Sequence, residues 1–236
     1  MEFPSALTEA RLIRRYKRFL ADVELPSGEV VTAHCPNPGS MLSLIEPEAS
    51  QTVWLSHSAD PKRKLAWSLE LLQVADTLVC VNTQRPNRAA EEAVAAGEIP
   101  ELSGYDTVRR EVRYGEGSRI DLLLQKDGRP DCYVEIKSVT MSRQEGLIEF
   151  PDSVTKRGRK HLIELSGMAA RGHRSVMLFL SPRADGRLFR PAADIDPAYA
   201  EALLSARHAG VELLCYTCAV SPGGIYPAGS VPVEVD

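Results

Sequence analysis

Three charged residues lie within two short apolar segments that a turn separates. Asp121 belongs to the first segment, whereas Glu135 and Lys137 belong to the second. The pair Asp127-Gly128 stands between them. Apolar segments of this length joined by such a turn are typical of a β-hairpin. Because a charge in a buried strand costs several kcal/mol unless it is paired or binds an ion, these residues require an explanation.

The expected hairpin, residues 118–138, brings the three charges together. Side chains two residues apart in a strand point to the same face, so Glu135 and Lys137 share one face. With the turn centred near Gly128, Asp121 lies opposite Glu135. Two converging carboxylates form an oxygen site suited to Mg²⁺ or Mn²⁺, and a lysine beside it could position water or stabilise developing negative charge. The alternative is a buried ion network that only holds the strands together.

The composition is that of an ordinary globular protein, with 44% hydrophobic and 25% charged residues among 236. No apolar segment approaches the ~20 residues that a membrane span needs, and basic residues interrupt any secretory pattern near the N-terminus. Five cysteines without a disulfide pattern indicate a reducing compartment. We therefore expect a cytoplasmic protein without membrane contact. The net charge of −4 argues against coating nucleic acid through overall charge, but it leaves room for local basic patches.

The first 81 residues contain strand-like segments. Strands are expected at residues 10–25, 29–35, 52–56, 64–74 and 77–81. Turn residues such as Pro26-Ser27-Gly28 separate them, and the proline-rich loop 36–41 follows the second strand. Five short strands in about 80 residues predict a small closed barrel of the OB type. We assign residues 1–81 to this domain.

Two basic clusters occur in the predicted barrel. One interleaves cations with aromatic rings and comprises Arg14, Arg15, Tyr16, Lys17, Arg18 and Phe19. The other comprises Lys62, Arg63 and Lys64. A surface of this kind can follow a phosphate backbone while its rings stack on bases. The alternative is a solvated strand edge, where lysine and arginine discourage aggregation.

From residue 82 onward, helical patterns alternate with strand patterns. Helices are expected at 87–96, 153–170 and 197–210, strands at 109–114, 174–181 and 211–219 besides the central hairpin, and an irregular tail from 221. A strand, a helix and another strand in succession imply parallel pairing in one sheet flanked by helices. Residues 82–236 are therefore expected to form a second domain of the α/β (α+β) class.

Two of these helices carry residues that concern the site. In the first, Asn87 is the expected N-cap, and helical spacing puts Glu92 on the apolar stripe, so Glu92 is the acid expected to face the interior. The first turns of the 153–170 helix carry Lys156, Arg157, Arg159 and Lys160. Cations at a helix N-terminus oppose the helix dipole. A bound anion such as a phosphate would offset this unfavourable placement.

The order of the elements and the acids resembles the PD-(D/E)xK nuclease superfamily, whose core is a helix with a glutamate, three strands carrying Asp and Glu-x-Lys, then a helix and a further strand. A more specific similarity covers the chain up to about residue 221, which resembles the sugar fermentation stimulation protein A family. The segments that carry it are residues 12–20, 33–37, 39–41, 62–64, 81–83, 118–121, 132–140, 150–152, 157–158 and 160–162. The chain departs from the family at Pro38, where threonine is usual, and at Asp60, where asparagine is more usual.

The resemblance implies an N-terminal OB-like domain joined to a restriction-endonuclease-like PD-(D/E)xK domain. It also implies a cytoplasmic DNA-binding protein of a family named for an effect on sugar use, maltose in particular. By position it places Glu92, Asp121, Glu135 and Lys137 in an active site. Three of these, Asp121, Glu135 and Glu92, become the expected ligands of Mg²⁺ or Mn²⁺, with the carbonyl of Ile136 as a further candidate.

Two functions remain open at this point. The first is a divalent-metal-dependent nuclease that hydrolyses phosphodiester bonds of single- or double-stranded DNA. The second is a non-specific DNA-binding transcriptional regulator of sugar metabolism that uses the nuclease fold without turnover. A carbohydrate-acting enzyme would rest on the family's name alone. In either case DNA contacts are expected from Arg14, Arg15, Tyr16, Lys17, Arg18, Lys62, Arg63, Lys64, Lys156, Arg157 and Lys160. The sequence indicates no protein partner.

Overall fold

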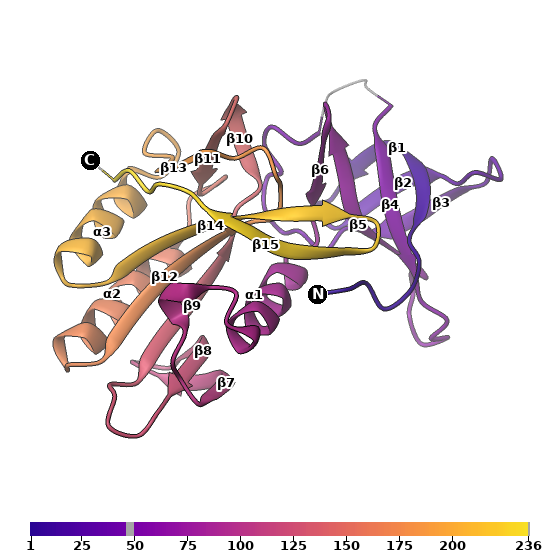
Figure 1. Cartoon of the computed structure of the whole chain (residues 1–236). Helices are drawn as coiled ribbons and strands as arrows, with labels where there is room; N and C mark the ends of the chain where they lie inside the picture. The colour runs from indigo at the N-terminus through magenta and orange to yellow at the C-terminus, as the bar shows by residue number, and fades with distance from the viewer. Residues whose placement is uncertain (46–49, 236) are drawn as a thin grey trace.

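The structure, a computed structural model, describes residues 1–45 and 50–235. Its N-terminal strands form a β-barrel, and the rest of the chain forms a second body in which helices cover a six-stranded sheet (Figure 1). The expected class, an OB-like barrel followed by a mixed sheet flanked by helices, is confirmed. Within the described ranges, no helix is long and apolar enough to cross a membrane.

The barrel is closed by five strands. The strands of this part of the chain are β1 (Thr8–Tyr16), β2 (Leu20–Glu24), β3 (Val30–His34), β4 (Thr52–His57), β5 (Trp67–Val74) and β6 (Thr77–Cys80). Antiparallel pairs join β3 to β2, β2 to β1, β1 to β4 and β4 to β5. A parallel contact between His34 and Ser68 joins β3 back to β5 and completes the ring. Alternate residues, such as Val23, Val53 and Leu55, point inward and are inaccessible to solvent.

The expected first strand, 10–25, is wrong in one respect, because it consists of two strands joined by a tight turn. Lys17 and Arg18 adopt φ values of 50° and 65°, a left-handed conformation that usually requires glycine or asparagine. Since neither residue is a turn former, no local pattern marks the break. The barrel therefore uses β1 and β2 as separate strands, and β6 extends the sheet beyond the ring.

The second body is built on the sheet order β15-β14-β12-β9-β8-β7. Its elements are α1 (Gln84–Ala96), the short 3-10 helix η1 (Pro100–Leu102), β7 (Thr107–Tyr114), β8 (Ser118–Gln125), β9 (Cys132–Ser138), β10 (Met141–Gln144), β11 (Leu147–Phe150), α2 (Lys156–Ala170), β12 (Arg174–Ser181), β13 (Leu188–Pro191), α3 (Pro197–His208), β14 (Glu212–Ser221) and β15 (Gly224–Ser230). The strands β9, β12 and β14 are parallel, as predicted, and β7, β8 and β9 are antiparallel. The central strand β9 is thus held on both sides.

Two parts of this body differ from expectation. The segment after Ser221 is not an irregular tail, because β15 pairs antiparallel with β14 through a turn at Ser221 and Gly224. Between the main elements, β10, β11 and β13 form a second sheet of three strands. Each of these strands has four residues, too few for a periodic pattern to be recognised.

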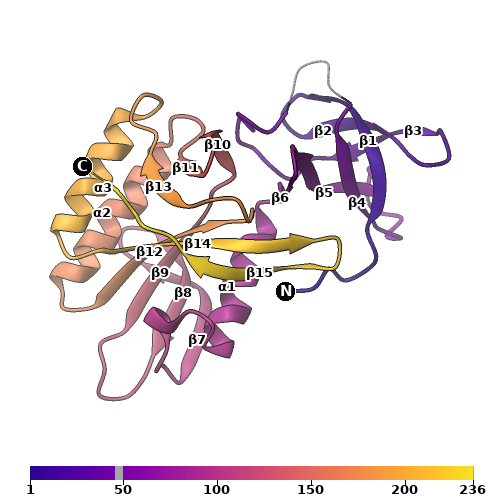
Figure 2. The same ribbon diagram turned by 45° about the horizontal axis from the view of Figure 1, so that its top comes forward.

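Helices cover both faces of the six-stranded sheet. The helix α1 packs on one face, where Ala89, Ala90 and Ala93 join a core cluster with Val134 and Leu178 of the sheet. The helices α2 and α3 lie side by side over the other face (Figure 2). Each of the two is capped by the residue before it: the Thr155 hydroxyl accepts the Gly158 N–H, and the Asp196 carboxylate accepts the Tyr199 N–H.

The barrel and the second body are joined through buried polar contacts. Glu70 of β5, 1% exposed, accepts hydrogen bonds from Ser56, from Asn82 and from both Nε and Nη2 of Arg85 at the start of α1. Met1 and Phe3 pack into the core cluster of α1 and the sheet. We propose that the two domains meet near residue 81, between β6 and α1, as the sequence suggested.

The Glu70–Arg85 pair gives a test of this junction. Replacing Arg85 by Ala leaves a buried carboxylate without its charge partner, and we expect the free energy of unfolding to fall by about 3 kcal/mol. The matched control is Arg88→Ala, three residues further along α1, whose side chain is 53% exposed against 20% for that of Arg85. Arg88 pairs with a half-exposed glutamate, so its loss should cost less than about 0.5 kcal/mol. Urea denaturation measures both, and equal effects of the two variants would contradict the assigned role of Arg85.

Candidate active site

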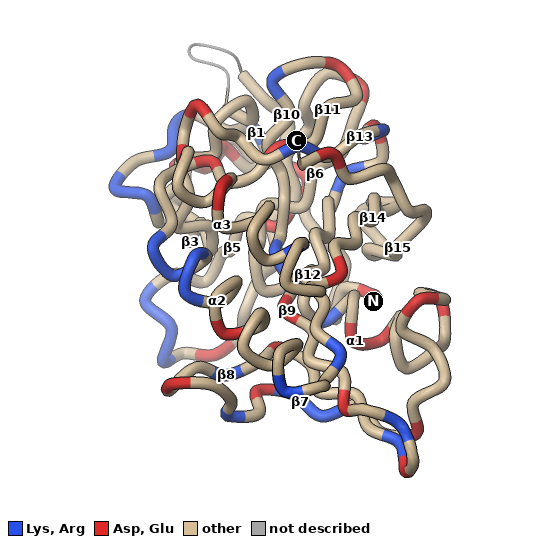
Figure 3. The backbone as a smooth tube through the Cα atoms, turned by 90° about the vertical axis from the view of Figure 1, so that its left-hand side faces the viewer, with Lys and Arg blue, Asp and Glu red and all other residues tan. Residues whose placement is uncertain are grey.

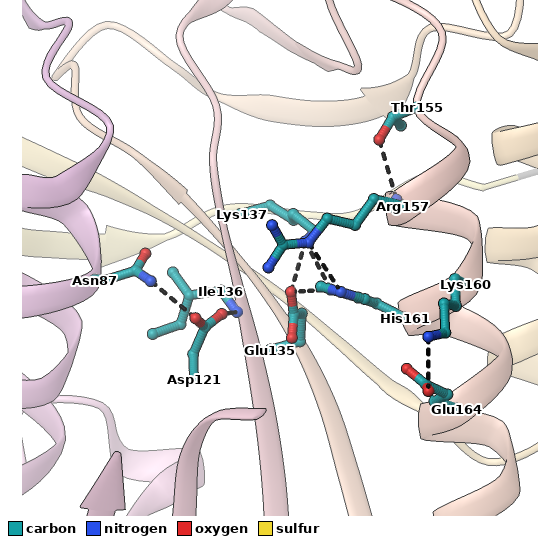
Figure 4. A network of polar contacts seen from close by, with 11 residues as sticks. Asn87, Asp121, Glu135, Ile136, Lys137, Thr155, Arg157, Lys160, His161 and Glu164 are labelled. Carbon is teal, nitrogen blue, oxygen red and sulfur yellow. Dashed lines mark hydrogen bonds and ion pairs between the residues drawn. The ribbon is translucent and has the colours of Figure 1, made fainter. Parts of the chain in front are cut away.

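The central hairpin has the register that the sequence predicts. Leu122 pairs with Val134 and Leu124 with Cys132, so one further step places Asp121 opposite Glu135. At that point the Asp121 side chain takes the place of a backbone acceptor in the ladder, because its Oδ2 accepts the backbone N–H of Ile136 at 2.7 Å. Its Oδ1 accepts the side-chain amide of Asn87 at 2.9 Å (Figure 4). The Asp121 carboxylate is therefore held between α1 and β9.

Glu135 is the most constrained acid of the site. It is 2% exposed, and its Oε1 accepts hydrogen bonds from Lys137 Nζ at 2.6 Å and from His161 Nδ1 of α2. Lys137 and His161 thus converge on one oxygen of Glu135 (Figure 4). The other oxygen, Oε2, is buried and has no hydrogen-bond partner among the described residues. Such an atom is costly in a folded protein unless something else binds it.

The two carboxylates have opposite pKa shifts. Burial and the neighbouring charge of Glu135 raise the pKa of Asp121 to about 6, although the Ile136 N–H and Lys137 act in the other direction. Burial would also raise the pKa of Glu135, but the hydrogen bond from His161 and the charge of Lys137 outweigh it, so that this pKa lies below its ordinary value. At neutral pH both acids are ionised, and Asp121 is ionised at a cost in stability.

The residues present fit a hard divalent cation. Glu135 contributes a buried oxygen without a partner, and burial together with the nearby charge of Glu135 raises the pKa of Asp121. In residues 1–45 and 50–235 no group of three or more His, Cys, Asp or Glu side chains has the spacing of a metal site. Two carboxylates are nevertheless a common protein contribution to Mg²⁺, which keeps several waters and takes substrate phosphate oxygens as ligands.

The expectation that Glu92 faces the interior is wrong. Its carboxylate pairs with Arg88 Nε at 2.8 Å and with the amino group of Met1 at 3.2 Å, and its side chain is 43% exposed. The expected N-cap is also wrong: the helix begins at Gln84 with Thr83 in the N-cap position. Asn87 is thereby placed inside the first turns, from which its amide reaches Asp121. The apolar stripe of α1 packs on the sheet, and Asn87 beside it reaches the hairpin at Asp121.

The basic residues of the first barrel cluster have different surroundings. Arg15 donates hydrogen bonds to the carbonyls of Arg18, Asn37 and Gly39 and to that of Ser40. Its guanidinium is therefore used to fix the loop after β3. Arg14 and Tyr16 both bond to Asp22 of the next strand. Lys17, Arg18 and the ring of Phe19, which is 47% exposed, project from the turn between β1 and β2.

The loop that Arg15 fixes is also bound to the second body. Ser40 Oγ donates to the carbonyl of Asp152, and the N–H of Met41 donates to the Asp152 carboxylate at 3.0 Å. Together the two parts enclose a cavity of about 170 Å³ that extends to Ser138, the residue after Lys137. This loop therefore holds the barrel against the end of β9 at which the site lies.

The other basic residues are distributed over the barrel and α2. Lys62, Arg63 and Lys64 lie exposed in the loop between β4 and β5, where Arg63 bonds to Ser68. Lys156 and Arg157 are exposed in the first turn of α2, and Lys160 contacts the carbonyl of Glu116 and the Glu164 carboxylate. In Figure 3, Lys and Arg segments recur along the edge of the molecule that passes the labels β3 and α2. Positive charge thus lies on both bodies.

Sequence reasoning missed two residues of the site, Asn87 and His161. Asn87 is predicted only as a helix cap, and His161 is not among the predicted site residues. The histidine is indeed buried, at 3% exposure. Its Nε2 accepts the Nε–H of Arg157, four residues earlier, at 3.3 Å. This i,i+4 spacing of a cation and a histidine on one helix face is the only signal that the sequence offered.

Comparison with known proteins agrees with this architecture. The family model "SfsA N-terminal OB domain" matches residues 13–81, and "Sugar fermentation stimulation protein RE domain" matches residues 84–224. Sugar fermentation stimulation protein homologs of Rhodospirillum centenum and Maricaulis maris are 57% and 53% identical to this chain. The alignments cover 95% and 100% of this chain and 96% and 99% of the homologs.

One solved structure is similar over the whole chain. It is described as "The structure of Pyrococcus Furiosus SfsA in complex with Ca2+", and it superposes with a TM-score of 0.88 at 27% identity. The match covers 100% of this chain and 98% of that one.

The electrostatics of Asp121 lead to a stability prediction. Its pKa is about 6 in the folded protein against an ordinary 3.8, so the folded state favours the protonated acid, and ionisation lowers stability as the pH rises from about 4 to above 6. Asp121→Asn mimics the neutral acid and can still accept the Ile136 N–H. In EDTA we expect this variant to be more stable than wild type by up to about 2–3 kcal/mol at pH 8.

The same comparison at pH 4 supplies the control, because the acid of the folded wild type is then largely protonated and the difference should fall below about 1 kcal/mol. Thermal and urea unfolding of both proteins across this pH range measure it. A destabilisation of equal size at pH 4 and pH 8 would show that ionisation of Asp121 does not strain the fold.

Proposed function

The chain belongs to the sugar fermentation stimulation protein family, and from this premise we propose that it binds DNA and hydrolyses its phosphodiester bonds with the help of a divalent cation. The observation that carries the proposal is the buried, unpartnered Oε2 of Glu135 beside Asp121 and Lys137. A purely structural ion network would use both oxygens of its central carboxylate.

Asp121 and Glu135 are the residues that would hold the cation. Both present oxygen ligands, which suit Mg²⁺ or Mn²⁺. The relative from Pyrococcus furiosus is described in complex with Ca²⁺, a cation that also prefers oxygen ligands. When bound, the cation supplies Lewis acidity and neutralises charge at the phosphate.

The other residues of the site hold Asp121 in place and orient the attacking water. Asn87 and the Ile136 N–H hold Asp121 from two sides, so that its carboxylate keeps a fixed position. Lys137 Nζ donates to Glu135 at 2.6 Å, and its ammonium group has further protons to donate. It can orient the attacking water and donate to a phosphate oxygen as negative charge develops there.

The DNA path is proposed to run from the barrel turn to the start of α2. Lys17 and Arg18 are exposed beside the ring of Phe19, which combines phosphate contacts with a surface for base stacking. Lys156 and Arg157 are exposed at the N-terminus of α2, close in the chain to His161. Arg15 is not a free cation here, since it already satisfies four backbone carbonyls.

Cleavage of DNA tests the catalytic part of the proposal. With Mg²⁺ or Mn²⁺, we expect wild type to cleave labelled single- or double-stranded DNA, and Lys137→Ala to lose at least about 100-fold in rate, because it removes a donor to the developing charge. Glu135→Gln should lose cation binding as well as cleavage. Matched controls are Lys126→Ala, in an exposed hairpin turn, and Glu145→Gln, in the exposed turn between β10 and β11.

Two outcomes would overturn the assignment. Cleavage that Lys137→Ala and Glu135→Gln leave intact would point to another site or to a contaminant. Salt-dependent binding of DNA with no cleavage under either cation would instead favour the second candidate, a DNA-binding regulator that does not turn over. The pairing of Glu92 with Arg88 and the Met1 amino group is the observation that favours this second candidate.

The DNA path makes its own prediction. Lys17→Ala and Lys156→Ala should each weaken binding uniformly across DNA sequences and each lower the slope of log K against log salt by about 1. Because the two lysines lie on different bodies, the double variant should lower the slope by about 2. Lys126→Ala, whose lysine pairs with Asp106, is the control. Fluorescence anisotropy at several salt concentrations measures this, and slopes that equal that of the control would exclude the proposed path.

A further inference from the structure

We infer that His161 is a positioning residue, which holds Oε1 of Glu135 through its Nδ1–H so that Oε2 is presented to the cation. The inference rests on the proposed function, since it concerns the same site. His161 does not touch the reacting atoms; it acts through Glu135. No motif in the hairpin reveals this role, because the histidine comes from the other side of the site, on α2.

The contacts of the ring define which nitrogen carries the proton. Nε2 of His161 lies 3.3 Å from Nε of Arg157, and the guanidinium can only donate. Nε2 must therefore offer its lone pair, and in the neutral ring the proton is on Nδ1. That proton then points at Oε1 of Glu135. This assignment follows from the network of donors and acceptors.

The neighbouring lysine is consistent with this tautomer. Lys137 Nζ lies 3.2 Å from His161 Nδ1 and 2.6 Å from Oε1 of Glu135. Since both nitrogens are donors, the short contact between them is not a hydrogen bond, and both donate to Oε1. An oxygen has two lone pairs, so these two donors saturate Oε1. Rotation of the carboxylate would break two hydrogen bonds at once.

The consequence is a carboxylate with two unlike oxygens. Oε1 is saturated by protein donors, whereas Oε2 is buried without a partner. A carboxylate that ligates a cation through one oxygen while the other is fixed by a neighbour is oriented before the cation arrives. Loss of such an outer contact typically weakens metal affinity 10- to 100-fold.

Two amide substitutions of His161 separate this role from simple packing. The amide nitrogen of Asn overlays Nδ1 of histidine, whereas that of Gln overlays Nε2. We expect His161→Asn to bind Mn²⁺ within about 3-fold of wild type, and His161→Gln to bind at least 10-fold more weakly. Free Mn²⁺ is measured by electron paramagnetic resonance at pH 8, and thermal unfolding in EDTA shows that each variant is folded.

The outcomes are distinct. If wild type binds no Mn²⁺ under conditions where it is folded, the proposed function fails and the inference falls with it. If wild type binds Mn²⁺ but the Asn and Gln variants lose affinity equally, or neither loses it, only the role of His161 is overturned.

A measurement on the wild-type protein covers the case in which a variant does not fold. Nitrogen-15 spectra of the histidine rings should show the His161 proton on Nδ1, and addition of Mg²⁺ should shift that signal while the resonance of an exposed histidine such as His208 stays in place. A proton found on Nε2 of His161 would contradict the inference directly.

Discussion

The second body is organised around one carboxylate that is buried and only half satisfied. Glu135 lies on the central parallel strand β9, where removal from water is most complete and an ionised acid is least tolerated. Lys137 and His161 supply donors to one of its oxygens. These donors stabilise the buried charge, but they leave the second oxygen without a partner. The remaining negative charge is what a cation would neutralise.

The scaffold explains why three different elements are needed to hold two acids. The strand β9 alternates its faces, so it can bring Glu135 and Lys137 to one side but cannot also supply their partners. The helix α2 covers that side and contributes His161, while α1 contributes Asn87 to the adjacent Asp121. Neither helix is fixed by the hairpin alone. The Glu70–Arg85 contact anchors the start of α1 to the barrel, and Thr155 fixes the start of α2.

What the sequence could predict depended on how local the signal was. The hairpin register followed from the turn at Gly128, the parallel sheet from a strand–helix–strand order, and the start of α3 from Pro197, since each is set by neighbours in the chain. The break at Lys17 and Arg18 could not be predicted, because those residues adopt a conformation that they seldom favour.

The site residues also divide into those that local sequence predicts and those that it does not. Glu92 was assigned to the interior because apolar residues usually mark the buried stripe of a helix. The apolar stripe of α1 does pack on the sheet, but Asn87 beside it reaches Asp121, and Glu92 pairs with Arg88 and Met1. Likewise Arg15 looked like a phosphate ligand but serves the carbonyls of a loop. That loop also binds Asp152 of the second body, so the residue that seemed to meet DNA instead holds the barrel in place beside the acids. A basic barrel surface can act together with a site at β9 only if the barrel keeps its position relative to β9, and Arg15 and Asp152 hold it there together with the Glu70–Arg85 pair.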